Sequence, residues 1–247
     1  IPFARTHILD TLCFRSPGAD RLALHPVSLT IERGQRIAFV GATGSGKTTT
    51  ADVILGLLPA TAGDLRVDDQ IIGAGNMHDW QSMLGYVPQH IFLADDSIRR
   101  NIAFGVAPDD IDDHLVEQAA RIANLHDFIT QELPGGYQSM VGERGVRLSG
   151  GQRQRIGIAR AVYRQPRVLV FDEATSALDN VTERQVMEAL RNLQGQETVI
   201  MIAHRLNTVR DCDIIFLFDK GKVIASGTYD QLVETNTRFR KMAGHPA

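Results

Sequence analysis

The sequence predicts an α/β fold in which a mainly parallel β-sheet carries helices on both of its faces. Short apolar runs alternate along the chain with segments of helical periodicity, as is typical of such folds. Three of the apolar runs are followed at once by a residue that is a candidate for a functional site: Gly41, Asp172 and His204. Because ligands of open α/β sheets bind beyond the carboxyl ends of the strands, we expect these three positions to meet in one crevice.

The periodicity of apolar residues and the positions of turn-forming residues predict the individual helices and strands. Residues 6–40 are expected to form strands joined by turns, since Val27–Ile31 alternates in polarity and residues 36–40 are mostly apolar. A helix is predicted from Thr48 to Leu55, and two short strands between Asp64 and Ile72. Another strand spans residues 84–87 and ends at Pro88-Gln89.

The middle of the chain changes to a helical period from Ser97 to about Thr130. Pro134-Gly135-Gly136 ends this insert, and Ser149 is the expected N-cap of a helix that runs to Tyr163. The strand and helix alternation then resumes. We expect strands at 167–171, 197–203 and 213–218, helices at 180–194 and from 228, and a hairpin strand at 222–226.

Composition sets the broad class. The chain has 247 residues, which suits one large domain or two lobes, and its 43% hydrophobic and 22% charged residues are ordinary for a globular protein. A net charge of −3 gives no indication of a nucleic-acid partner. Cys13 and Cys212 lack metal-ligand spacing, and we expect both to be reduced, buried or half-buried residues.

No apolar run approaches the ~20 residues that a membrane-spanning helix needs. The chain begins at Ile1 without an initiator methionine or a signal peptide. We therefore expect a soluble fragment of a longer protein, and the missing part could be a membrane domain.

The segment Gly41-Ala42-Thr43-Gly44-Ser45-Gly46-Lys47-Thr48 is a phosphate-binding loop between a strand and a helix. Its glycines let successive backbone N–H groups point at an anion, and the helix N-terminus adds partial positive charge. Lys47 would reach the β- and γ-phosphates, and the Thr48 hydroxyl would bind Mg²⁺. The predicted nucleotide-binding residues here are Gly41, Thr43, Gly44, Ser45, Gly46, Lys47, Thr48 and Thr49.

Asp172 and Glu173 follow the apolar run Val168–Phe171. Asp172 is predicted to hold Mg²⁺, as the Walker B aspartate of phosphate-loop NTPases does. Glu173 beside a γ-phosphate would polarise the attacking water. Leu148-Ser149-Gly150-Gly151-Gln152 is a second glycine-rich turn that opens a helix, and hence a second candidate anion site.

Together these motifs resemble the nucleotide-binding domain of an ATP-binding-cassette (ABC) transporter, and the resemblance extends from about Thr6 to Val233 in family order. It implies a phosphate-loop NTPase (RecA-like) core with an N-terminal antiparallel β subdomain and an inserted α-helical subdomain. The expected boundaries within 1–247 are a core lobe of 6–88 and 165–247, and a helical lobe of 89–164. ATP and Mg²⁺ are the implied ligands.

The resemblance also assigns further residues. Gln89 would contact Mg²⁺ and the attacking water, and His204 would contact the γ-phosphate, so that Glu173, His204 and Gln89 form the catalytic set. The implied metal ligands are Thr48, Gln89 and Asp172. Ser176-Ala177-Leu178-Asp179 resembles the D-loop, which makes Asp179 a nucleotide-site residue.

In this family the Ser-Gly-Gly-Gln turn closes over the ATP of a second copy in a head-to-tail dimer. We therefore expect Ser149, Gly150, Gly151 and Gln152 to complete a partner's site, reciprocally, as in isologous interfaces. ATP would join two domains, and hydrolysis would open the dimer and drive transport. The implied location is the cytoplasmic face of a membrane, such as a bacterial inner membrane.

Two stretches favour the exporter branch. Val141-Gly142-Glu143-Arg144-Gly145 resembles the exporter X-loop, and Gln89–Gly105 resembles the exporter segment that receives a coupling helix of the membrane domain. Both are expected to contact that domain. The apolar residues Ile91, Phe92 and Phe104 form either this groove or ordinary lobe core.

Two positions depart from the exporter pattern. Ser16 stands where exporters usually have an aromatic residue that stacks on adenine, which puts the preference for ATP over GTP in question; Phe14 is expected to pack in the sheet. Met140 replaces an acidic X-loop residue that many exporters carry.

Three other functions remain open. An importer ATPase is the nearest alternative, although the Val141–Gly145 segment argues against it. A soluble ABC ATPase of chromosomes would place a long coiled coil between its motifs, for which residues 49–148 leave no room, and a ribosome-acting type would carry two cassettes. A module without turnover would not need Glu173, Gln89, His204 and Ser149.

Overall fold

The computed structural model describes residues 6–16, 18, 21–173, 178–192, 197–203 and 205–244. These residues fall into two compact units, one made of Ile1–Leu84 with Gln196–Ala247 and the other of Gly85–Gly195. The second unit extends beyond the predicted helical lobe of 89–164 at both ends, and the predicted lobe boundaries stay an expectation. None of the helices in the described parts is long and apolar enough to cross a lipid bilayer.

The first unit contains an antiparallel sheet at its N-terminus. Its strands are β1 (Thr6–Phe14), β2 (Leu24–Glu32), β4 (Ala62–Val67) and β5 (Gln70–Ile71), in the order β2-β1-β4-β5. On β2, the buried residues Leu24, Val27, Leu29 and Ile31 alternate with exposed ones over most of the strand, as the sequence pattern predicts. The antiparallel β subdomain is thereby confirmed.

The other strands of this unit form a mixed sheet. Its order is β10-β9-β3-β8, with β3 (Arg36–Val40), β8 (Thr198–Ile202), β9 (Ile214–Asp219) and β10 (Lys222–Gly227). β3 is parallel to β8 and β9, and β10 returns antiparallel to β9. Phe39 in the middle of β3 is fully buried, with its ring centroid 6.0 Å from that of Phe216 and 5.2 Å from that of Phe218.

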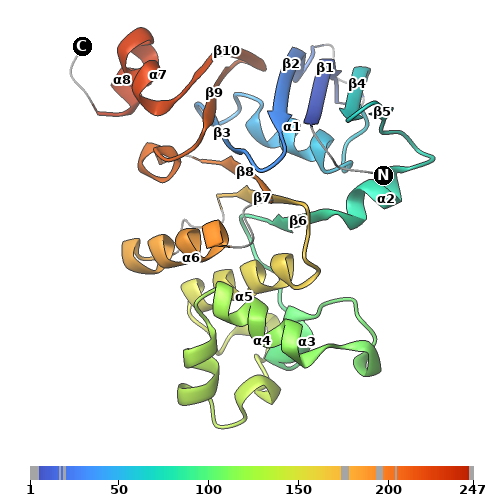
Figure 1. Cartoon of the computed structure of the whole chain (residues 1–247), viewed down its shortest axis with the longest axis vertical. Coiled ribbons are helices and arrows are strands. Elements are labelled where there is room, and N and C mark those ends of the chain that lie inside the picture. The colour runs from blue at the N-terminus through green and yellow to red at the C-terminus, as the bar shows by residue number, and fades with distance from the viewer. Residues whose placement is uncertain are drawn as a thin grey trace. The chain divides into compact units, whose positions relative to one another are not determined.

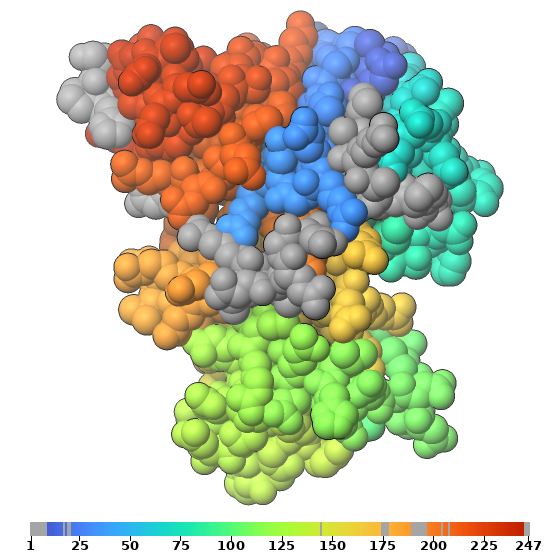
Figure 2. All heavy atoms as spheres, viewed as in Figure 1, coloured from blue at the N-terminus to red at the C-terminus, as the bar shows by residue number. Residues whose placement is uncertain are grey.

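Helices flank these strands (Figure 1). They are α1 (Lys47–Ile54), α2 (Met77–Ser82), α7 (Tyr229–Thr235) and α8 (Thr237–Met242), with a 3₁₀ turn at Leu206–Val209. α7 and α8 pack on each other through Tyr229 and Phe239, whose ring centroids are 5.5 Å apart, and form one block of the surface in Figure 2. The short α2 is held by Trp80, which is fully buried and donates to the Ile54 carbonyl over 2.7 Å.

The second unit is mostly helical. It contains α3 (Ile98–Ile102), α4 (Asp113–Ile122), α5 (Gly150–Tyr163) and α6 (Asn180–Asn192), with the neighbouring strands β6 (Leu84–Val87) and β7 (Val168–Asp172). Short turns of helix lie at Pro108–Asp110, Phe128–Glu132, Gly136–Gln138 and Glu143–Gly145. The buried face of α4 includes Val116 and Ala119, two of the residues that the helical period predicts.

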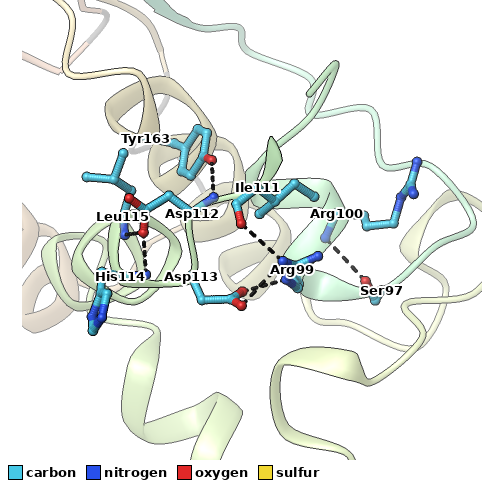
Figure 3. A network of polar contacts seen from close by, with 9 residues as sticks. All are labelled: Ser97, Arg99, Arg100, Ile111, Asp112, Asp113, His114, Leu115 and Tyr163. Carbon is cyan, nitrogen blue, oxygen red and sulfur yellow. Dashed lines mark hydrogen bonds and ion pairs between the residues drawn. The ribbon is translucent and has the colours of Figure 1, made fainter. Parts of the chain in front are cut away.

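A polar network joins the ends of three of these helices (Figure 3). Asp112 caps α4 by accepting from two backbone N–H groups, and its own N–H donates to the Tyr163 hydroxyl at the end of α5 over 3.1 Å. Arg99 of α3 pairs with Asp113 and lowers the pKa of that carboxyl. The network fixes α3 and α4 relative to the C-terminal end of α5.

Candidate functional site

The phosphate loop joins β3 to α1 in the first unit. Gly41, Gly44 and Gly46 all have positive φ values, +148°, +76° and +106°, and Gly46 is the N-cap of α1. A Cβ on Gly41 would lie 2.3 Å from the Phe218 carbonyl oxygen, so only glycine fits there. The Ser45 carbonyl accepts from the Gly221 N–H over 2.8 Å, which ties the loop to the β9–β10 turn.

Lys47 and Ser45 are the buried polar side chains of this loop. The Lys47 ammonium, 4% exposed, donates to the Gly41 and Ala42 carbonyls over 2.9 and 3.1 Å. The Ser45 hydroxyl is buried and finds no hydrogen-bond partner among the described residues. The Thr48 side chain, in the first turn of α1, is exposed, and that of Thr49 is half-buried. This loop presents N–H groups, a cation and hydroxyls, which are donors suited to a phosphate chain.

The carboxylates of the second unit lie at the end of β7. Every residue of this strand is buried, and Asp172 is 7% exposed. The next residue, Glu173, is half-buried and has a φ of +50°. Its Oε2 accepts a hydrogen bond from Gln89 Nε2 over 3.1 Å. The structure thus brings together two of the residues predicted for catalysis from positions far apart in the sequence.

The second glycine-rich turn forms the N-terminus of α5. The Ser149 hydroxyl accepts from the Gln152 N–H over 3.1 Å, and the Gln152 side chain accepts from the Ser149 N–H over 2.7 Å. This capping box satisfies two backbone donors at the start of the helix. Gly150 is exposed and Gly151 half-buried, so these two positions add no side chain beyond a hydrogen to the start of α5.

Asp179 has a structural role that the sequence analysis did not assign. Its carboxylate caps α6 by accepting from the Val181 and Thr182 N–H groups, both over 3.0 Å, and from the Thr182 hydroxyl over 2.6 Å. Hydrogen bonds from Thr182 lower the pKa of Asp179 to about 2. The Asp-x-x-Thr spacing at the start of a helical pattern is the sequence feature that could have indicated this cap.

The predicted site residues are not all described, and those that are described belong to two units. His204, Ser176 and Ala177 are outside the described residues. The phosphate loop belongs to the first unit, whereas Gln89, Ser149, Asp172 and Glu173 belong to the second. Their assembly around one nucleotide therefore stays a prediction. Within the described ranges, no three or more His, Cys, Asp or Glu side chains cluster as metal ligands.

The two predicted contact segments for a membrane domain differ in exposure. In Gln89–Gly105, Phe92 and Phe104 are 62% and 46% exposed, whereas Leu93, Ile98 and Ile102 are buried. These two phenylalanines are therefore not ordinary lobe core. In Val141–Gly145, Val141 is buried, Glu143 is exposed, and the preceding Met140 is 49% exposed.

Comparison with known proteins decides the family. The model of the family described as ABC transporter matches residues 24–176, which is more than half of the chain. The chain belongs to the ABC transporter family. Its relatives are exporter-type proteins, and the chain is an ABC ATPase domain of that type.

Two relatives and one solved structure are examples of the similarity. The heterocyst differentiation ATP-binding protein HepA of Nostoc sp. is 43% identical over 90% of the chain and 36% of its own length. The ATP-dependent lipid A-core flippase of Alkalilimnicola ehrlichii is 39% identical over 94% of the chain and 39% of its length. The structure of a bacterial Atm1-family ABC exporter with ATP bound is 36% identical and superposes with a TM-score of 0.92, covering 99% of the chain and 42% of that chain. The present chain thus spans less than half the length of each of these proteins.

Proposed function

We propose that this ABC ATPase domain hydrolyses Mg-ATP in a head-to-tail dimer and thereby drives transport by an exporter. The observation that carries the hydrolysis is the hydrogen bond between Gln89 and Glu173. This bond holds two groups side by side. The Glu173 carboxylate is assigned to the attacking water, and the Gln89 amide is assigned to the metal and the water. The family and its ATP-bound structural relative support the nucleotide.

The phosphate loop binds the triphosphate in this proposal. Backbone N–H groups between Gly41 and Thr48 point at the phosphates, and Lys47 exchanges its bonds to the loop carbonyls for bonds to phosphate oxygens. The buried Ser45 hydroxyl, which lacks a described partner, supplies a further donor. Each of these groups neutralises or hydrogen-bonds negative charge in a largely dry environment, where such contacts stabilise a transition state most.

The residues proposed for Mg²⁺ fit the ion chemically. Thr48, Gln89 and Asp172 would supply a hydroxyl, an amide oxygen and a carboxylate, and Mg²⁺ prefers such hard oxygen ligands. Gln89 already donates through its Nε2 to Glu173, so its Oε1 stays able to accept or to bind a cation. Bound Mg²⁺ would neutralise charge on the β- and γ-phosphates. Glu173 orients the water and takes its proton, and His204 contacts the γ-phosphate.

The signature turn serves the second copy. Ser149 and the N–H groups of Gly150 and Gly151 form a helix N-terminus with little side-chain cover, which suits the γ-phosphate of a partner's ATP. Asp179 lies near the same interface in this proposal. The membrane domain would contact Gln89–Gly105, including the exposed Phe92 and Phe104, and Val141–Gly145, at the cytoplasmic face of a membrane.

The test is Mg-ATP hydrolysis by the purified chain over a wide range of protein concentration. We expect specific activity to rise with concentration, because two copies complete each site. Glu173→Gln should lower kcat by about 10²–10⁴-fold, the usual contribution of a general base. Glu188→Gln, which makes the same change at an exposed position of α6, should leave kcat unchanged. Full activity of Glu173→Gln would refute the assigned chemistry.

A further inference from the structure

The side chain of Arg160 joins helix α5 to the loop that follows Gln89. Its guanidinium donates to the Phe92 carbonyl through Nη1 over 2.9 Å and to the Asn101 carbonyl through Nε over 2.8 Å. Its Nη2 donates to the Asn101 side-chain oxygen over 3.2 Å. All of these residues belong to the second unit. One side chain in the last turns of α5 thus holds two points of the 92–101 segment.

The charge of Arg160 has no acidic counterpart in the described part of the unit. No ion pair with a carboxylate forms there, and burial lowers the pKa of Arg160 to about 10. The group nevertheless stays charged at neutral pH. Carbonyl oxygens and the ring of Phe104, whose centroid lies 4.6 Å from the guanidinium carbon, take the place of a carboxylate. Removing a charged guanidinium from water without an ion pair costs free energy of folding. The contacts of Arg160 with the loop are therefore candidates for a functional role.

Asn101 extends the same contact toward Gln89. It is fully buried, accepts from the Ala94 N–H over 2.9 Å and donates to the Ala94 carbonyl over 3.0 Å. Residues 88–96 form no helix or strand of their own. The path of this loop therefore depends on Asn101 and Arg160 rather than on a regular backbone ladder.

A second contact holds the loop to α5 still closer to Gln89. Gly157 lies one turn before Arg160, and a Cβ there would lie 2.4 Å from Ile91 Cδ1. Ile91, only two residues after Gln89, thus packs directly on the helix backbone. The loop touches α5 at Gly157 through Ile91 and at Arg160 through Phe92, and Gln89 lies a short way before both contacts in the chain.

We propose that Arg160 is a positioning residue for hydrolysis: by fixing residues 91–101 on helix α5, it holds the Gln89 amide on the Glu173 carboxylate. The inference rests on the roles proposed above for Gln89 and Glu173. It also makes α5 a direct mechanical link, because the helix carries the Ser149 turn at one end and Arg160 near the other.

Lysine cannot replace Arg160 in this role. A lysine keeps the charge, but its compact ammonium does not reproduce the planar fork that contacts Phe92 and Asn101 together. We expect Arg160→Lys to lower kcat at least about tenfold, since a small misplacement of catalytic groups has effects of this size. KM for ATP should stay within about twofold, because the phosphate loop lies in the other unit and uniform binding is unaffected.

The experiment measures kcat, KM for ATP and Tm of the purified chain, with kcat expressed per folded molecule. Gly157→Ala is the second variant, and it decides the question if Arg160→Lys does not fold. Its added methyl displaces Ile91, so kcat per folded molecule should fall, and Tm measured alongside separates this effect from a loss of folded protein. Arg164→Lys, which makes the same change at the exposed C-cap of α5, is the matched control and should retain kcat.

The outcomes are distinct. A fall in kcat with unchanged KM supports positioning. Unchanged kcat per folded molecule, or a loss of activity that only follows the loss of folded protein, overturns it. Glu173→Gln, assayed in parallel, separates the two proposals: if that variant keeps its activity, the proposed function fails, whereas an inactive Glu173→Gln with a fully active Arg160→Lys rejects only the role of Arg160.

Discussion

Replacing Gly41 by alanine tests whether close packing of the phosphate loop, and not only its positive φ values, requires glycine. A residue with a side chain in a left-handed conformation costs about 1–2 kcal/mol. The Cβ of alanine at position 41 would also lie 2.3 Å from the Phe218 carbonyl oxygen and 2.8 Å from Ser45 Oγ. Relieving such overlap with backbone typically adds about 1–3 kcal/mol. We therefore expect Gly41→Ala to lower the free energy of unfolding by about 2–5 kcal/mol.

Gly44→Ala provides the matched control. Gly44 also has a positive φ, +76°, but a Cβ there would meet nothing within 4 Å. Its expected cost is the conformational part alone, about 1–2 kcal/mol. Denaturant unfolding of both variants, followed with and without ATP, measures the difference. Equal destabilisation by the two substitutions would refute the packing argument, and tighter nucleotide binding by Gly41→Ala would refute the role of this loop geometry.

Three further predictions concern Ser149, Asp179 and Ser16. Ser149→Ala removes the oxygen that caps α5 and should lower the free energy of unfolding by about 1 kcal/mol in denaturant titrations; no change would mean that the cap contributes nothing. The pKa of Asp179, lowered to about 2 by Thr182, means that its stabilisation is present above its unfolded pKa and is lost as pH falls through about 2. Between the unfolded pKa of Asp179 and a pH of about 2, the free energy of unfolding of Asp179→Asn should therefore fall less with decreasing pH than that of the unsubstituted chain. Ser16→Tyr should lower KM for ATP about fivefold or more, since stacking on a base contributes ~1–3 kcal/mol; an unchanged KM would place residue 16 away from the base.

Elements with strong local patterns could be predicted from the sequence. The alternation of β2, the glycines before α1 and the Ser-x-x-Gln spacing at Ser149 each specify a structure through neighbouring residues, and each is present. Helix α2 could not be predicted in this way. It is six residues long and has one buried residue, Trp80, whose indole bonds to the Ile54 carbonyl on a distant segment. Tertiary packing, not propensity, forms that helix.

The same distinction between local and long-range contacts applies to the candidate functional site. The phosphate loop is a contiguous segment, so its residues determine its conformation and its chemistry together. The contact between Gln89 and Glu173 joins residues of two loops, and no spacing in the sequence reveals it without the family resemblance. Arg160 was missed because a lone arginine in a helix usually reads as solvent-exposed. Its importance follows from the carbonyl oxygens of Phe92 and Asn101, which no sequence pattern brings to it.

The left-handed backbone of Glu173 has a consequence for how this domain can evolve. Glutamate at a φ of +50° is strained, whereas asparagine and glycine adopt this conformation far more easily. A substitution to either residue would remove the proposed base and at the same time relax the backbone. At position 173, therefore, the residues that would make the fold more stable are not the residue that ATP hydrolysis needs. In a duplicated copy freed from the need to hydrolyse ATP, we expect this glutamate to be among the first residues of the site to disappear.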